Sequence, residues 1–175
     1  MFLFLLVTML VGVAGYQIHF VSRRRRLAAR SWDEVLGRVE QVNFEGLRSI
    51  ADCYLQPDKD QLRIEPDAIW EMAGGLEGIG RLKANAAVML ELAVFAERWN
   101  GEQGPVISEM IRRDAVRLNR AVTCIQLAYL FRLGFVRVPF YLQEASAAYY
   151  LMRGRLLGLY HNSHIGLLPR LEAAI

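Results

Sequence analysis

The feature that most constrains this chain is an uncharged apolar run close to its N-terminus. Residues 2–21, FLFLLVTMLVGVAGYQIHFV, contain no charged side chain. As a helix, about 20 residues extend over about 30 Å, which matches the hydrocarbon core of a bilayer. A buried core helix at the extreme N-terminus of a chain would rarely be apolar around its whole circumference. The run therefore predicts a transmembrane anchor over residues 1–22.

The charges that follow this run predict how the anchor is oriented. Residues 23–30 form a basic juxtamembrane segment, and the positive-inside rule places such a cluster in the cytoplasm. We therefore expect a single-pass protein, as in a bacterial inner membrane, with residues 31–175 as a cytoplasmic domain. The residues expected at the membrane interface, against anionic headgroups, are Tyr16, His19, Arg23, Arg24, Arg25, Arg26 and Arg30.

A cleaved signal peptide is the alternative interpretation of this run. The small residues Val13 to Gly15 resemble a cleavage site. A signal peptide, however, carries its positive charge before the apolar run, whereas here the arginines follow it. The order of the charges favours the anchor.

The charge balance bears on the class of partner. The net charge is +3, but without Arg23 to Arg26 and Arg30 the chain has 16 basic and 18 acidic residues. The basicity therefore belongs to one short segment, and the folded domain is nearly neutral. This balance argues against a general polyanion-binding surface, so we expect no nucleic-acid partner.

Helical periodicity and helix-ending residues organise the rest of the chain. Ser31 and Glu34 match a capping box, with apolar residues repeating at helical spacing after it. The predicted helices cover 32–55 (one kinked helix or two), 67–73, 76–99, 105–133, 140–160 and a short C-terminal piece broken at Pro169. The pattern predicts an all-α fold, with a cytoplasmic bundle of about four to six helices after the anchor.

Two inner segments are apolar enough to raise the question of further spans. Ala84–Ala96 and Ala121–Phe131 are short and bounded by charged residues, which favours core helices over spans. We expect them at the centre of the bundle. The long helix carries an apolar stripe at steps of three or four, namely Ile107, Ile111, Ala115, Leu118, Val122, Ile125 and Tyr129.

A few polar residues could carry chemistry, each with a structural alternative. Glu91 lies among apolar residues, so it is either a buried carboxylate of a polar pocket or an acid that faces solvent or pairs with an arginine of the long helix 105–133. Gly74 to Lys83 places glycines and Arg81 at a helix start, as at a phosphate site or at a tight helix junction. Arg113, Arg117 and Arg120 share one helix face, which suits anions, anionic lipid or plain solvent.

These observations predict a binding protein rather than an enzyme. No set of catalytic residues is recognisable, and we expect no metal and no cofactor. The favoured function is a membrane-anchored scaffold or adaptor that docks a protein partner at the cytoplasmic membrane face. The alternative is a small-ligand-binding protein or enzyme with a polar pocket around Glu91, to which Arg81, Arg113, Arg117 and Arg120 are the candidate contributors.

Overall fold

The protein is helical throughout the part of the chain that the structure describes. The computed structural model describes residues 31–56, 64–101, 103–131, 138–163 and 166–175, of which 84% are helical and none is in a strand. The seven helices of these segments are α2 (Trp32–Leu36), α3 (Phe44–Leu55), α4 (Pro66–Met72), α5 (Gly75–Glu97), α6 (Gln103–Leu130), α7 (Val138–Ser163) and α8 (Leu168–Ala174). The predicted all-α class is confirmed for these residues.

The predicted anchor and juxtamembrane segment, residues 1–30, lie outside the described residues. None of the helices in the described segments is long and apolar enough to cross a membrane. This finding agrees with the expectation that Ala84–Ala96 and Ala121–Phe131 are not spans.

Capping residues set the first helix boundaries. The Ser31 hydroxyl accepts a hydrogen bond of 3.2 Å from the main-chain N–H of Glu34, as the predicted cap requires. The region 32–55 forms two helices, because the chain leaves α2 after Leu36 and starts α3 only at Phe44. Asn43 caps α3 by accepting a hydrogen bond of 3.1 Å from the N–H of Gly46. Residues 37–43, which are not helical, are called the connecting segment below.

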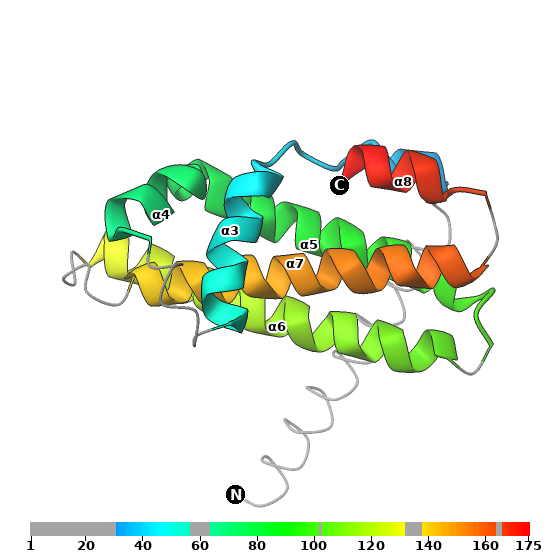
Figure 1. Ribbon diagram of the computed structural model, residues 1–175. Helices are drawn as coiled ribbons and strands as arrows, with labels where there is room; N and C mark the ends of the chain where they lie inside the picture. The colour runs from blue at the N-terminus through cyan, green and yellow to red at the C-terminus, as the bar shows by residue number, and fades with distance from the viewer. Residues whose placement is uncertain (1–30, 57–63, 102, 132–137, 164–165) are drawn as a thin grey trace, which may run out of the picture. The chain divides into compact units, whose positions relative to one another are not determined.

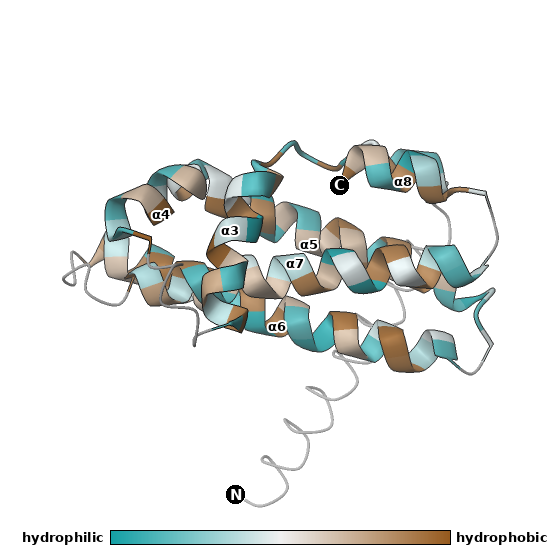
Figure 2. Ribbon diagram, viewed as in Figure 1, coloured by the Kyte–Doolittle hydropathy of each residue, from teal (hydrophilic) through white to brown (hydrophobic). Residues whose placement is uncertain are grey.

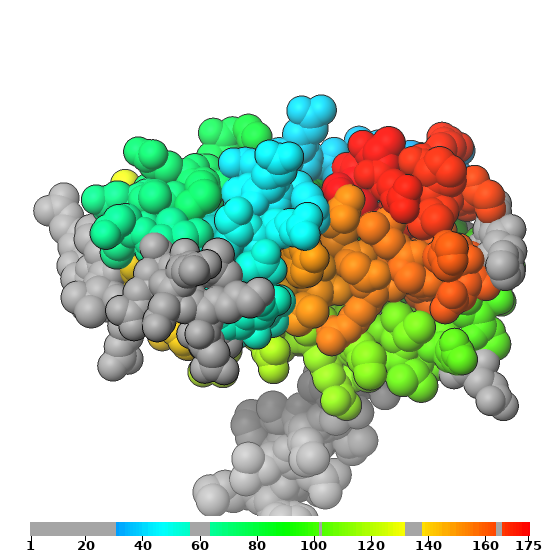
Figure 3. Space-filling view, in the orientation of Figure 1, coloured from blue at the N-terminus to red at the C-terminus, as the bar shows by residue number. Residues whose placement is uncertain are grey.

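Residues Val35–Ile175 form one compact unit built on three long helices. α5, α6 and α7 lie alongside one another, and α3 crosses over α7 (Figure 1). α4 packs near one end of α7, and α8 packs on α7 toward the other end. In the space-filling view, α7 is visible between α3 and α8, with α6 along its lower edge (Figure 3).

α7 is the central helix, because α3, α4, α5, α6 and α8 all pack against it. Its buried residues do not form one stripe but include the consecutive positions Ala145 to Tyr149. The visible side of α7 accordingly mixes brown, pale and teal residues along its length (Figure 2). Other core residues come from α3 (Leu47, Ile50), α5 (Leu82, Met89, Leu92) and α6 (Ile111, Leu118, Ile125).

The expected apolar stripe of the long helix is confirmed in its middle and wrong at its end. Ile111, Ala115, Leu118, Val122 and Ile125 are buried, but Tyr129 is 52% exposed. The expectation that Ala121–Phe131 lies at the bundle centre is therefore wrong beyond Ile125. Leu127 is one of the exposed residues, since it follows Arg120 by seven positions and shares its outward face.

The C-terminal piece also differs from the prediction. Pro169 does not break a helix but lies in the first turn of α8. A first-turn residue needs no N–H for the helix ladder, so proline is accommodated there.

Glycines form the corner between α4 and α5, as the tight-junction interpretation of this segment expected. Gly74 and Gly75 have φ angles of +74° and +60°, a left-handed conformation that few other residues adopt. At Gly78, an added Cβ would lie 1.8 Å from the carbonyl oxygen of Ala73. Only glycine allows α5 to pass this close to the end of α4.

This corner gives a matched pair of substitutions on one helix. Gly78→Ala should lower the free energy of unfolding by about 1–3 kcal/mol or more, because the methyl group overlaps backbone that cannot move away freely. Gly80→Ala should raise it by about 0.5–1 kcal/mol, since nothing lies within 4 Å of the new Cβ and alanine favours helix. Denaturant unfolding of both variants measures the two changes. Equal effects at the two positions would contradict the proposed close approach.

Candidate functional site

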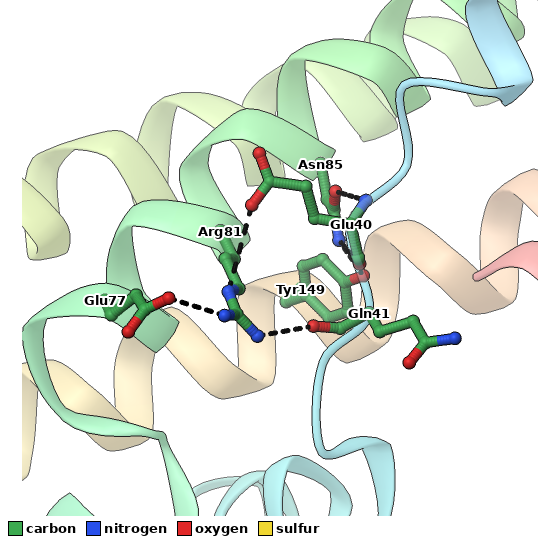
Figure 4. A network of polar contacts seen from close by, with 6 residues as sticks. All are labelled: Glu40, Gln41, Glu77, Arg81, Asn85 and Tyr149. Carbon is green, nitrogen blue, oxygen red and sulfur yellow. Dashed lines mark hydrogen bonds and ion pairs between the residues drawn. The ribbon is translucent and has the colours of Figure 1, made fainter.

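A buried asparagine holds the connecting segment against the bundle. Asn85 of α5 is fully buried. Its Oδ1 accepts a hydrogen bond of 2.8 Å from the N–H of Glu40, and its Nδ2 donates one of 2.7 Å to the Glu40 carbonyl (Figure 4). Nδ2 also lies 3.3 Å from the hydroxyl of Tyr149 on α7. The side chain therefore satisfies both main-chain groups of Glu40, which would otherwise lose their hydrogen bonds on burial.

Arg81, one turn earlier on α5, binds the same segment. Its guanidinium lies 2.5 Å from the Glu77 carboxylate and 3.9 Å from that of Glu40, and it donates a hydrogen bond of 3.3 Å to the carbonyl of Gln41 (Figure 4). Two carboxylates thus surround one guanidinium. Carboxylates of the protein itself therefore occupy the position at which an external anion was predicted to contact Arg81.

A small polar pocket lies next to Arg81. It has a volume of about 170 Å³, below the range of about 300–1,000 Å³ that is usual for ligand sites. The lining residues are Gln41, Val42, Asn43, Leu47, Met72, Ala73, Gly74, Glu77, Gly78, Arg81 and Leu82. Its volume suits a few water molecules. Because Glu40 and Glu77 outweigh Arg81 in charge, the pocket does not favour a phosphate.

Glu91 pairs with an arginine, as one of its two interpretations expected, although the partner is not on the long helix. Its Oε2 lies 2.8 Å from Nη1 of Arg38, and the Glu91 side chain is 14% exposed. Arg38 belongs to the connecting segment. The contacts of this segment thus run antiparallel to α5, with Arg38 at Glu91, Glu40 at Asn85 and Gln41 at Arg81.

The three candidate arginines of α6 lie together on its solvent side, on a different helix from Arg81 and Glu91. Arg113, Arg117 and Arg120 are all exposed. Nε of Arg113 lies 3.5 Å from Glu109, which also pairs with Arg112 at 2.7 Å. Tyr16, His19, Arg23 to Arg26 and Arg30 fall outside the described residues, so their predicted membrane contacts are not tested.

The buried polar residues Asn85, Ser108, Asp114 and Ser146 were not predicted from the sequence, and Asn85 and Asp114 have the larger polar side chains among them. Asp114 of α6 is buried and forms an ion pair with Arg155 of α7, and Asn85 is the second such group. Both positions could have been recognised, because Asn85 follows Leu82 by three residues and Asp114 follows Ile111 by three, on the buried sides of their helices. Their partners could not, since these depend on how the helices pair.

An apolar pocket lies between the beginnings of α4 and α7. It has a volume of about 280 Å³ and is lined by Pro66, Asp67, Trp70, Val138, Pro139 and Leu142, of which only Asp67 is charged. Phe140 is 53% exposed next to this lining, and its ring centroid lies 6.0 Å from that of Tyr54 at the end of α3. This set of residues is called the end pocket below.

Comparisons with known proteins do not assign the chain to a family. No known protein family, no curated protein and no solved structure matches it. In the described segments, no group of three histidine, cysteine or acidic residues is placed to hold a metal ion.

Removing the Asn85 side chain tests its role in holding the connecting segment. Asn85→Ala should lower the free energy of unfolding by about 1–3 kcal/mol, because it leaves the N–H and carbonyl of Glu40 without their partners. Asn162→Ala, at an exposed position near the end of α7, should change it by less than about 0.5 kcal/mol. Chemical denaturation of both variants provides the comparison, and similar losses would argue against the role given to Asn85.

Tyr149 should make the stability of the protein sensitive to alkaline pH. Burial raises the pKa of its hydroxyl above the ordinary value of about 10, and the hydrogen bond from Asn85 only partly opposes this shift. Above pH 10 the unfolded chain therefore loses this proton before the folded protein does, and the free energy of unfolding falls as the pH rises.

Unfolding measured between pH 9 and 11 should show a weaker loss in Tyr149→Phe than in the unchanged protein. Tyr129→Phe is the control, because Tyr129 is 52% exposed. An identical pH dependence in Tyr149→Phe and the unchanged protein would contradict the assignment.

Proposed function

We propose that the helical domain is a membrane-tethered docking module that binds a protein partner at the end pocket. The supporting observation is an apolar hollow that lies beside exposed aromatic side chains. Pockets of this kind accept one large apolar side chain of a partner, which then supplies much of the binding free energy. At about 280 Å³ the end pocket is near the lower limit for ligand sites, which suits a single side chain better than a cofactor.

The surroundings of the end pocket define the chemistry of this partner. Phe140 is 53% exposed and its ring lies 6.0 Å from that of Tyr54, so it offers apolar area outside the pocket itself. Clusters of exposed apolar residues with a polar margin are typical of protein interaction sites. Asp67 in the lining and Glu65 at the start of α4 favour a partner segment with a lysine or arginine beside its apolar side chain.

The alternative of a polar ligand pocket receives less support. Arg81 contacts Glu77, Glu40 and the Gln41 carbonyl, and Glu91 pairs with Arg38. A ligand at either residue would have to displace these contacts and leave charged groups without their partners. Both residues are better explained as attachments of the connecting segment.

The location of the module is part of the same proposal. The apolar run 2–21 followed by Arg23 to Arg26 supports a single anchor with the helical domain on the cytoplasmic side. A tether raises the effective concentration of the domain at the membrane surface. Even a modest end-pocket interface would therefore retain a partner that is itself at the membrane.

Site-specific cross-linking in native membranes tests the docking proposal. A photoreactive phenylalanine analogue replaces Phe140 in the full chain, and we expect it to give one discrete adduct with another protein. Asp67→Lys should reduce this adduct about tenfold, because like charges brought together at an interface are strongly unfavourable. Asp67 is exposed, so the fold should tolerate the change.

A probe at Glu172 is the matched control, since this residue is exposed on α8, away from the end pocket. It should not yield the same adduct. An adduct that forms equally from both positions, or that is insensitive to Asp67→Lys, would contradict docking at the end pocket.

A further inference from the structure

We propose that the solvent-facing side of α6 binds anionic phospholipid headgroups. This surface, called the α6 outer face, is separate from the end pocket and consists of Val106, Met110, Arg113, Val116, Arg117, Arg120 and Leu127. At helical spacing these positions fall within one third of the circumference, opposite the buried residues of α6. They therefore form one continuous strip along the helix.

The charge of this strip is strongly unbalanced. Among the described residues, the carboxylate paired with it is Glu109, which is shared between Arg112 and Arg113. Arg117 and Arg120 have no carboxylate within 4 Å in the described part of the chain. The strip thus carries three guanidinium groups, of which only that of Arg113 is paired with a carboxylate within the segments that the structure describes, on a domain that is nearly neutral as a whole. An anionic surface is the complementary partner.

The apolar side chains of the strip are as unusual as its charge. Of the 12 large hydrophobic residues that are exposed in the described segments, four belong to this strip, namely Val106, Met110, Val116 and Leu127. Val106 and Val116 are 57% and 65% exposed, and Val116 lies directly between arginines. Exposure to water is unfavourable for such apolar side chains. They therefore indicate a partner that has an apolar layer beneath its charged groups.

An anionic bilayer surface meets both requirements. A helix that lies in the interface places arginines among the headgroups and apolar side chains at the start of the acyl chains. α6 has 28 residues, or about 42 Å, which gives a long, straight contact of this kind. Nucleic acid would attract the arginines but leave the valines and Leu127 in water.

Fluorescence in vesicles of defined composition tests this proposal on the full chain. Cys53 and Cys124 are first replaced by alanine, and an environment-sensitive fluorophore is attached through Val116→Cys. In vesicles that contain phosphatidylglycerol, we expect a blue-shifted emission and quenching by nitroxide-labelled lipid. In pure phosphatidylcholine vesicles we expect neither. The same fluorophore on Glu172→Cys should not respond to lipid charge, because α8 packs on another side of α7 (Figure 1).

Variants of the three arginines distinguish the effect of their positive charge from that of the planar guanidinium group. Arg113→Gln, Arg117→Gln and Arg120→Gln together should lower the membrane-docked to undocked ratio on the order of 100-fold. The triple lysine variant should keep the docked state, since headgroup attraction needs the charge but not the planar guanidinium. Circular dichroism checks that both variants remain helical, as expected for exposed positions.

Two results would contradict lipid binding by the α6 outer face. A Val116 probe that ignores lipid charge would overturn the proposal. So would a probe that responds to an acidic peptide or an oligonucleotide as strongly as to phosphatidylglycerol. The end-pocket docking of a protein partner would be unaffected by either result, because it is measured from a different surface.

Discussion

The burial of α7 on several sides is the constraint on which the rest of the fold depends. The consecutive residues Ala145 to Ala148 have small side chains, and all four are buried. Small residues let neighbouring helices approach a helix axis closely, so α7 can be surrounded by five other helices instead of resting on one layer. A larger side chain anywhere in this run would push one of them away. The close packing of helices around α7 therefore depends on a short stretch of small residues.

The connecting segment shows how polar residues can serve the fold rather than chemistry. It is not helical: the N–H groups of Arg38 and Val39 bond to carbonyls of α2, and the main-chain groups of Glu40 and Gln41 bond to side chains of α5. Asn85, Arg81 and Glu91 are the α5 residues that contact it. In a sequence, such residues resemble members of a ligand site, because both roles require polar groups at the edge of an apolar helix.

Much of the secondary structure was predictable, because its signals are local. Ser31, Asn43, Gly74 and Pro66 act within one turn of their own helices, and each marks a boundary in the structure. The central place of α7 was not predictable in this way, since a helix buried on several sides has no apolar face to recognise.

The candidate site was harder to predict from the sequence than the helices were. The shared face of Arg113, Arg117 and Arg120 follows from helical spacing, and the structure shows all three exposed. The pairing of Glu91 with Arg38 joins residues 53 positions apart, and periodicity carries no information about such a contact. The end pocket likewise brings Trp70 and Leu142 together through tertiary packing alone.

The antiparallel course of the connecting segment along α5 has a mechanical consequence. Tension applied through the residues before Val35 first meets the fully buried side chain of Val35. It then reaches the contacts of Arg38 with Glu91, of Glu40 with Asn85 and of Gln41 with Arg81, in that order. These three contacts therefore carry such a load one after another in chain order, so the connecting segment would separate from α5 stepwise, beginning at its Arg38 end.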